Sequence, residues 1–216
     1  MKRILLAAIM VFVALAQTGC GGGGSSAPPT FVTSIFSDSA VDGDITQFPP
    51  GIVTQGMTPT VQSVFAGIDP VTLLESRAFL DFPLTTVPAN AIIQSAVLDI
   101  VINSIQLPTS TVPIRIDLVS PPSLTLALTD FNLSALATTT IVPPISPADV
   151  GLNTHVPVDV TVLMAEAQRL GLADFRVRIS EDSAVVVAPP GLIEINDTTD
   201  PTNRGNFAPL LKVTFF

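Results

Sequence analysis

Apolar and polar residues alternate with a period of two in several segments of the chain. In residues 112–120 every second position is apolar and faces one way, whereas Arg115 and Asp117 face the other way. Residues 175–180 repeat this pattern with arginines between the apolar positions, and residues 210–216 alternate again. Such alternation, with many β-branched residues, is typical of half-buried antiparallel strands. We therefore expect a strand in each segment, and expect the last strand to hold the C-terminal residues in a sheet.

A different period appears in residues 158–171, where apolar residues fall at helical spacing. Asp159 or Thr161 can cap the first turn, and Gly171 can supply the left-handed residue at the end. The pattern predicts one short helix over residues 161–170, which we expect to cover one end of the fold.

Prolines divide the rest of the chain into short pieces. The sequence contains 20 prolines, with Pro-Pro pairs at 49–50, 121–122, 143–144 and 189–190. Proline lacks a ladder donor, so these pairs are expected at turns or strand ends. Residues 91–105 are more uniformly apolar, which indicates a central strand. No second linker or charge block interrupts residues 31–216. We predict a single all-β domain there, a two-sheet antiparallel sandwich of the jelly-roll type.

The N-terminal segment has the pattern of an export signal. Lys2 and Arg3 precede an apolar run of 13 residues, residues 4–16. A membrane-spanning helix needs about 20 residues, so this run is too short to span a bilayer. Residues 17–20 (QTGC) resemble a bacterial lipobox, which implies that residues 1–19 are a lipoprotein signal peptide and that Cys20 is acylated, for example with palmitate.

A flexible tether follows the cysteine. Residues 20–30 are rich in Gly, Ser and Pro and contain no core-forming pattern, as expected of a link to an anchor. Gly21 is not the Asp that resembles an inner-membrane retention signal, which favours the outer membrane, on either its periplasmic or its cell-surface side. The alternative is cleavage after Ala16 by ordinary signal peptidase, which would release the protein.

Residues 77–102 resemble the opening of DNRLRE-type β-sandwich modules, where a strand R-x-F-L-x-F-D-L precedes a Pro-Ala turn and then I-x-S-A-x-L-x-I. The matching residues are Arg77, Phe79, Leu80, Phe82, Pro88, Ala91, Ile93, Ser95, Ala96, Leu98 and Ile100. Pro83 stands where the family has Asp. Residues 158–171 resemble the family's D-V-T helix. The last residues resemble its closing strand, although Ala208 replaces an Arg there.

This resemblance implies an extracellular module, and some members of that family are classed as carbohydrate-binding modules. The matching positions are mainly core positions, so they indicate the fold more than the function. The chain contains no Trp and no Tyr, the residues on which sugar rings usually stack, and its 12 Phe suit a core better. Sugar binding through Arg, Asp and Asn stays an alternative.

Composition excludes several classes of protein. Only 12% of residues are charged, and 18 acidic residues against 9 basic ones give a formal net charge of −9. The chain lacks the basic face that nucleic-acid binding requires. One His and one Cys exclude a zinc cage built from those ligands, a disulfide framework and a Cys/His catalytic pair.

Two groups of acidic residues are candidates for cation binding. Asp38, Asp42 and Asp44 lie close together around Gly43, and oxygen ligands of this kind suit calcium. The alternative is a surface turn, with Gly43 allowing the chain to reverse. The second group consists of Glu194, Asp197 and Asp200. If the two groups meet in space, they form a stronger candidate than either alone.

The strand-like segments also carry charges. These are Arg77, Asp99, Arg115, Asp117, Arg176 and Arg178. We expect cross-strand pairs on a solvent-exposed sheet face; the alternative is a patch that binds an anionic ligand. His155 is the only imidazole, no G-x-S-x-G turn exists, and a histidine at the start of a strand is the simpler interpretation. A carboxylate pair of the glycosidase type stays open, with only four Glu available.

These observations predict a lipid-anchored, non-enzymatic β-sandwich protein of the outer membrane. Its expected role is adhesion, scaffolding or another envelope interaction, with no required cofactor. The alternative is a carbohydrate-binding module tethered by lipid. The expected partners are the membrane, through the N-terminal lipid, and either polysaccharide or envelope proteins, but not nucleic acid.

Overall fold

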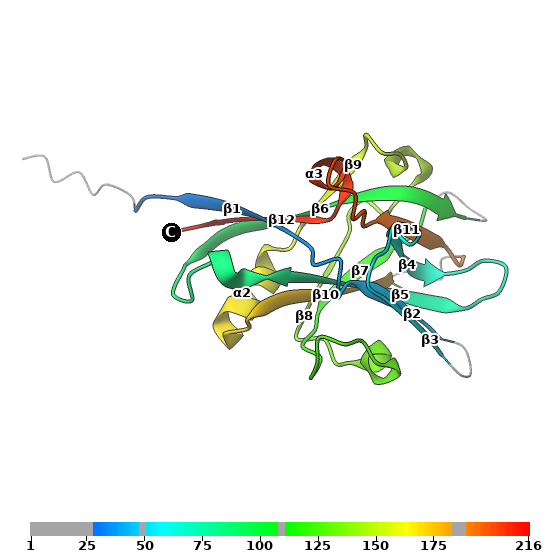
Figure 1. Cartoon of the computed structure of the whole chain (residues 1–216), viewed down its shortest axis with the longest axis horizontal. Coiled ribbons are helices and arrows are strands. Elements are labelled where there is room, and N and C mark those ends of the chain that lie inside the picture. The colour runs from blue at the N-terminus through cyan, green and yellow to red at the C-terminus, as the bar shows by residue number, and fades with distance from the viewer. Residues whose placement is uncertain (1–27, 48–50, 108–110, 183–188) are drawn as a thin grey trace, which may run out of the picture.

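The computed structural model describes residues 28–47, 51–107, 111–182 and 189–216 (Figure 1). The predicted signal peptide, Cys20 and most of the tether lie outside these residues. The strands are β1 Phe31–Phe36, β2 Gly43–Thr46, β3 Ile52–Gln55, β4 Ser63–Ile68, β5 Glu75–Pro83, β6 Ile93–Gln106, β7 Ile114–Leu118, β8 Ala137–Thr140, β9 His155–Asp159, β10 Asp174–Glu181, β11 Leu192–Asn196 and β12 Leu210–Phe215. The helices are α2 Thr161–Leu170 and α3 Arg204–Phe207, with short 3₁₀ turns η1 Leu84–Thr86, η2 Leu128–Asn132 and η3 Pro147–Asp149.

The strands of these ranges form one twelve-stranded antiparallel sheet that curls back on itself (Figure 1). Its main path runs β1-β12-β6-β11-β4-β5-β10-β7-β8, with β2 and β3 beside β5 and β9 beside β6. The 14-residue β6 is the longest of them. Its first half pairs with β12 and β9, and its second half pairs with β11. The all-β expectation is therefore confirmed.

The strands predicted from alternation are present. β7, β10 and β12 cover the three alternating segments, and β6 covers the uniformly apolar one. In β12, Leu211, Val213 and Phe215 are buried while Lys212 is exposed, so the last residues are held in the sheet between β1 and β6. The period-two pattern thus identified β7, β10 and β12, and the uniformly apolar run identified β6.

The predicted helix is also confirmed. α2 spans Thr161–Leu170 and ends at Gly171, whose φ of 66° is left-handed. The N-cap residue is Val160, which has no side-chain capping bond, and the backbone N–H of Thr161 donates to the Asp159 carboxylate at 2.9 Å in the turn that leads into the helix. The apolar face of α2, Leu163, Met164 and Ala167, packs into the main core that the curled sheet encloses. Among the described residues, no helix has both the length and the apolar character needed to cross a membrane.

The outer face of β5, β10 and β7 is covered, which the sequence pattern did not predict. Residues 119–136, including η2, fold across it, and Phe131 and Leu126 form a second small core with Phe79 and Ile45. The expectation of solvent-exposed charge pairs on this face is therefore wrong for Arg176, Arg178 and Asp117, all of which are buried. Leu126 and Phe131 of this segment bury their side chains against the sheet, and the segment covers these charges at the same time.

The Pro-Pro pairs within the described residues lie outside the strands, as expected. The pair at 49–50 lies outside the described residues. Gly43 does not form the predicted turn and instead begins β2. A Cβ at Gly43 would lie 2.1 Å from the carbonyl oxygen of Thr54, so the glycine allows β2 and β3 to approach closely.

Candidate functional site

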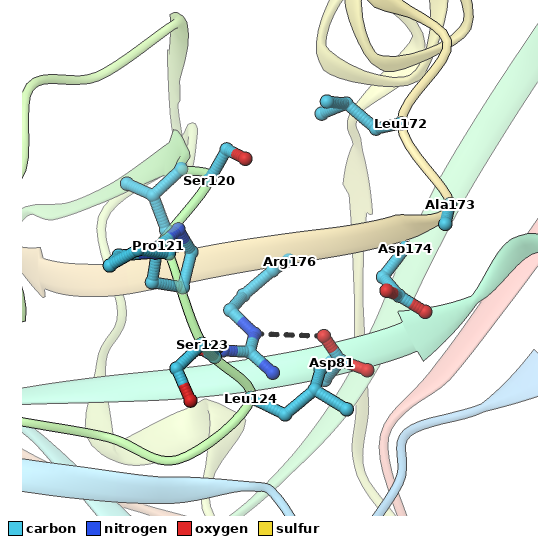
Figure 2. Close-up of a pocket in the computed structure, with 11 residues that line it drawn as sticks. Asp81, Ser120, Pro121, Ser123, Leu124, Leu172, Ala173, Asp174 and Arg176 are labelled. Carbon is cyan, nitrogen blue, oxygen red and sulfur yellow. Dashed lines mark hydrogen bonds and ion pairs between the residues drawn. The ribbon is translucent and has the colours of Figure 1, made fainter.

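A pocket of about 300 Å³ opens beside β10, where the 119–124 segment leaves β7 (Figure 2). One wall is the run from Val119 to Leu124, and the other is Leu172 to Asp174, which connects α2 to β10. Asp81 of β5 and Arg176 of β10 lie at the bottom. The pocket therefore joins a loop, a helix end and two central strands.

An ion pair forms the polar floor of this pocket. The Nε of Arg176 donates to Oδ1 of Asp81 at 2.8 Å, and both side chains are buried. Arg176 Nη1 donates to the carbonyl oxygen of Ser123 at 3.0 Å, whereas Nη2 is buried without a hydrogen-bond partner among the described residues. A buried N–H without an acceptor is unfavourable. The floor thus contains one N–H group that is closed off from solvent and that no described acceptor satisfies.

Burial raises the pKa of Asp81, and the neighbouring Arg176 guanidinium partly offsets that rise. Asp174 lies beside the pair at the start of β10 and is only half-buried (Figure 2). The pocket consequently holds two carboxyl groups and one guanidinium. Such a set can both donate to and accept from a neutral polar molecule.

The loop wall of the pocket is held in place from outside the loop. The backbone N–H of Val119 donates to the carbonyl oxygen of Arg176 at 3.0 Å, which continues the β7–β10 pairing. Gln55 of β3 donates to the carbonyl of Leu124 at 2.7 Å and accepts from the N–H of Leu126 at 2.9 Å. These bonds set the loop position before any ligand arrives.

A pair of buried carboxyl groups lies behind the pocket. Asp42, from the β1–β2 connection, and Asp197, directly after β11, are fully buried and adjacent. Asp42 accepts from the backbone N–H of Asp81 at 2.7 Å, and Asp197 accepts from the Ser37 hydroxyl at 3.2 Å. Within the described part of the chain, the Oδ2 atom of each carboxyl group has no hydrogen-bond partner.

Burial and the neighbouring Asp197 charge raise the pKa of Asp42 well above its usual range, and burial raises the pKa of Asp197. Two adjacent buried carboxyl groups favour a state in which they hold one proton together. Arg204 lies on the other side of Asp197, at 3.8 Å between Nη1 and Oδ1, and also donates to the carbonyls of Thr198 and Ser37. The two acidic segments of the sequence therefore do meet in space, at Asp42 and Asp197.

The three carboxylates predicted to bind calcium have separate roles. Asp38 is exposed and accepts from the backbone N–H of Ala40 in a turn. Asp44 is buried in β2 near the N–H of Phe65, and its burial raises its pKa to about 6. Over the described ranges, no three His, Cys, Asp or Glu side chains are grouped so as to hold a metal ion.

The second acidic group is also divided. Glu194 accepts from the Ser63 and Ser104 hydroxyls at 2.7 Å each, which links β11 to both neighbouring strands. Asp200 accepts from Asn203 and from the N–H of Thr202, and so shapes the turn before α3. These two carboxylates stabilise local structure, and only Asp197 joins the first group.

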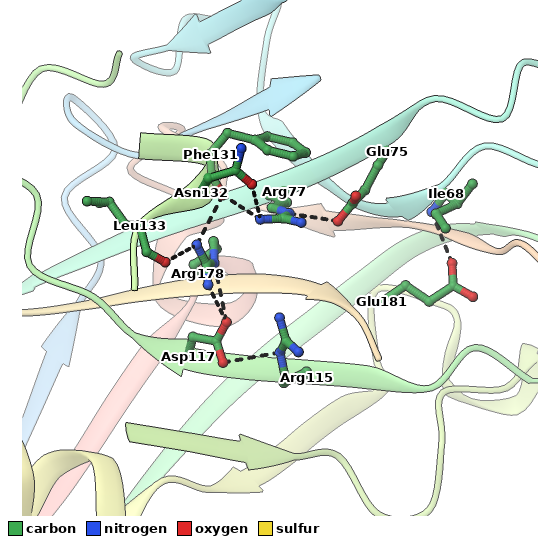
Figure 3. Close-up of polar contacts among 10 residues, drawn as sticks. All are labelled: Ile68, Glu75, Arg77, Arg115, Asp117, Phe131, Asn132, Leu133, Arg178 and Glu181. Atoms are coloured by element: carbon green, nitrogen blue, oxygen red, sulfur yellow. Dashed lines mark hydrogen bonds and ion pairs between the residues drawn. The ribbon is translucent and has the colours of Figure 1, made fainter. Parts of the chain in front are cut away.

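A second arginine of β10 is fully committed to structure (Figure 3). Arg178 makes two hydrogen bonds to Oδ2 of Asp117, and it donates to the carbonyls of Phe131 and Leu133. Asp117 also lies 3.2 Å from Nε of Arg115. Arg178 thus holds residues 119–136 on the sheet, and its role is structural.

His155 begins β9, as expected, and its Nδ1 lies 2.9 Å from Oδ2 of Asp99 on β6. The imidazole is exposed and far in the fold from the Arg176 pocket, since β9 pairs with β6 on the other side of the sheet path. No described residue that lines the pocket is a histidine or a cysteine. The polar groups of the lining are serine hydroxyls, carboxyl groups and one guanidinium.

The sequence pattern identified Arg176 but placed it on a solvent face, and it did not single out Asp174 or Asp81. The available signal was the composition of residues 119–136, where five leucines and one phenylalanine follow a Pro-Pro pair. So many apolar residues are unusual in a loop that is free in solvent. This composition therefore indicates that the segment packs over another part of the fold. No known family model matches the chain, and no curated protein matches its sequence.

Proposed function

We propose that this protein is a non-catalytic binding module of the cell envelope whose Arg176 pocket binds a hydroxyl-rich ligand, a saccharide unit of a polysaccharide. The observation that carries the proposal is the Nη2 of the buried Arg176 on the pocket floor, which no described residue accepts from. Asp81 holds the guanidinium plane in place, so this donor is preorganised. Because Nη2 is closed off from solvent, a ligand oxygen in the pocket bonds to it only after the side chains over it move.

The chemistry of the lining favours a neutral polyol over an ion. Asp174 and Asp81 would repel an anion, and Arg176 would repel a cation. Hydroxyl groups both donate and accept, so they suit a lining that contains carboxylates and a guanidinium group. Leu124 and Leu172 supply apolar contact for the C–H face of a sugar, in place of the absent Trp and Tyr. A volume of about 300 Å³ suits one or two sugar rings.

A binding role without catalysis is supported by the state of the carboxyl groups. Asp81 forms an ion pair with Arg176 at 2.8 Å. Of the two carboxyl groups in the described pocket lining, Asp174 is the one outside this ion pair. Glycoside hydrolysis requires two carboxyl groups that act as acid and base. We therefore propose recognition of a saccharide rather than its cleavage.

We also propose that the curled sheet is a two-layer sandwich in which β6 belongs to both layers. β1, β12 and β9 lie on one half of β6, and β11 leads to the other strands from its second half. The apolar residues of both groups share one main core. This arrangement agrees with the likeness to DNRLRE-type modules that residues 77–102 carry.

Filling the pocket tests the binding proposal. Ala173→Trp places an indole in the pocket from its exposed rim without removing the Arg176–Asp81 pair. On an array of oligosaccharides and polysaccharides we expect the wild-type protein to bind at least one glycan, and Ala173→Trp to bind it about tenfold or more weakly, a loss of about 1.4 kcal/mol.

Ala148→Trp is the matched control, because Ala148 is exposed on η3 and does not line the pocket. It should bind as the wild type does, and circular dichroism should show both variants folded. An array on which the wild-type protein gives no signal above background contradicts the saccharide proposal. Equal binding by Ala173→Trp places the ligand elsewhere.

We further propose that acylated Cys20 holds the module at the outer membrane. The apolar run of residues 4–16, the QTGC sequence and the tether support this proposal. Mass spectrometry of the mature N-terminus should find Cys20 carrying acyl chains, and Cys20→Ser should leave the membrane fraction. A mature chain that starts at Gln17 without lipid contradicts the anchor and supports a released protein.

A further inference from the structure

One end of the molecule is apolar and open to solvent. Phe31 and Val32, at the start of β1, are 55% and 57% exposed, and Ile92 in the neighbouring turn is 58% exposed. Beside Phe31 lies a shallow hollow of about 310 Å³, lined by Phe31, Pro88, Asn90, Ala91, Phe215 and Phe216. We call this set of residues, with Val32 and Ile92, the apolar end.

The apolar end is a rigid part of the sheet rather than a loose terminus. Phe31 is paired with Phe215 across β1 and β12, and their rings stack at 6.0 Å between centroids. The backbones of Ile92 and Phe216 exchange two hydrogen bonds, at 2.9 and 3.2 Å. Because the backbone fixes Phe31 and Ile92, their side chains stay exposed instead of folding into the core.

No side chain of the apolar end is charged, although the chain has a formal net charge of −9. A cluster of exposed Phe, Val and Ile without charge is unfavourable in water and marks a surface with a partner. Its lack of charged side chains fits a partner that is itself apolar or zwitterionic rather than a charged protein surface.

The tether ends at this same place. The described chain starts at Pro28, three residues before Phe31. If Cys20 is acylated, residues 20–30 separate the lipid from β1, and a Gly/Ser-rich chain of that length spans roughly 18 Å on average. The anchor therefore holds the start of β1, and with it the apolar end, within a short average distance of the bilayer.

We propose that the apolar end docks on the bilayer, with the rings of Phe31 and Phe216 and the side chain of Ile92 in the headgroup–acyl boundary. This inference rests on the proposed lipid anchor. Docking removes the exposed apolar groups from water and orients the module with its opposite end away from the membrane. A zwitterionic lipid surface accepts this end without repulsion from charge.

The absence of Trp and Tyr provides a direct test. Phe31→Trp introduces a single indole at the apolar end. The acylated chain is reconstituted in phosphatidylethanolamine–phosphatidylcholine vesicles with brominated acyl chains, which quench indole only at short range. We expect the emission of the Phe31→Trp variant to shift to shorter wavelength and to lose on the order of half its intensity.

Val71→Trp is the matched control. Val71 is 85% exposed in the β4–β5 connection, which lies at the opposite end of the molecule from the start of β1 (Figure 1). With the same anchor in the same vesicles, this indole should keep its emission. Circular dichroism verifies that both variants fold.

The outcomes separate docking from anchoring. If the Phe31→Trp variant is bound to the vesicles but its indole is not quenched, docking is overturned and the anchor proposal is unaffected.

If the chain carries no lipid, the anchor proposal fails. Docking is then tested by adding Cys20→Ser to each variant and using a high lipid concentration. There, quenching of the Phe31→Trp indole but not of the Val71→Trp indole supports docking, and quenching of neither overturns it. A shift in the Phe31→Trp emission that follows protein concentration without vesicles overturns docking in favour of a second copy.

Discussion

At the scale of single residues, buried carboxyl groups make the stability of the fold depend on pH. Asp42, Asp44 and Asp197 are all buried, and burial raises the pKa of each. A carboxyl group with a raised pKa binds its proton more tightly in the folded state than in the unfolded chain. The free energy of unfolding therefore falls as the pH rises through that window.

The substitution Asp44→Asn isolates one of these groups. The pKa of Asp44 is about 6 in the folded protein, against a usual value of 3.8, so ionising it costs the folded state about 2–3 kcal/mol between pH 4 and pH 6. We expect the wild-type free energy of unfolding to fall over this range, and Asp44→Asn to reduce the fall. Denaturant titrations at each pH measure it.

Asp69→Asn is the control for that titration. Asp69 is exposed, and hydrogen bonds from Thr72 and Val71 hold its pKa below the usual value, so it is already ionised across this window. Its variant should keep the wild-type slope. An unchanged slope in Asp44→Asn would show that the Asp44 carboxyl group does not titrate as its burial requires. Burial also raises the pKa of Asp42 and Asp197, so these groups make the free energy of unfolding depend on pH in both variants.

At the scale of elements, close strand approach depends on particular glycines. Gly67 in β4 has φ of 118°, and a Cβ there would lie 2.1 Å from the carbonyl oxygen of Gly191, beside its partner strand β11. Neither the backbone conformation nor the space allows an L side chain. The position of β4 between β11 and β5 therefore depends on this residue.

Gly67→Ala should lower the free energy of unfolding by about 2 kcal/mol or more, because the backbone must shift or hold a strained φ. Gly205→Ala in α3 is the matched control, since nothing lies within 4 Å of a Cβ there and φ is ordinary. It should change stability by no more than about 1 kcal/mol. Equal denaturant midpoints for the two variants would contradict the close approach.

At the scale of the whole molecule, one core joins nearly all elements. Apolar residues of β6, β10, β12 and α2 belong to the same buried cluster, although they are far apart in the chain. A molecule with one continuous core is expected to unfold as a unit. If residues 31–216 form a single domain, as the sequence predicts, they should therefore unfold in one cooperative transition.

The two tryptophan variants of the pocket experiment also test this cooperativity. Ala173→Trp reports on the end of α2, and Ala148→Trp reports on η3. Their fluorescence transitions in denaturant should coincide with the loss of β structure measured by circular dichroism. A separate, earlier transition for either probe would divide the chain into independent units.

Elements whose signal is local could be predicted from the sequence. The alternation in β7, β10 and β12, the helical spacing in α2 and the left-handed Gly171 are properties of neighbouring residues, so they could be predicted with their approximate bounds. The same local patterns identified Arg176 and the two acidic segments as candidates, without showing their surroundings.

Tertiary structure alone decided what those candidates do. Arg176 meets Asp81 across 95 residues of chain, and Asp42 meets Asp197 across a larger separation. Alternation tells that a side chain faces away from the core, but not that residues 119–136 will cover that face. The ionisation, pairing and accessibility of a charged group depend on the elements packed against it, and these come from distant parts of the chain.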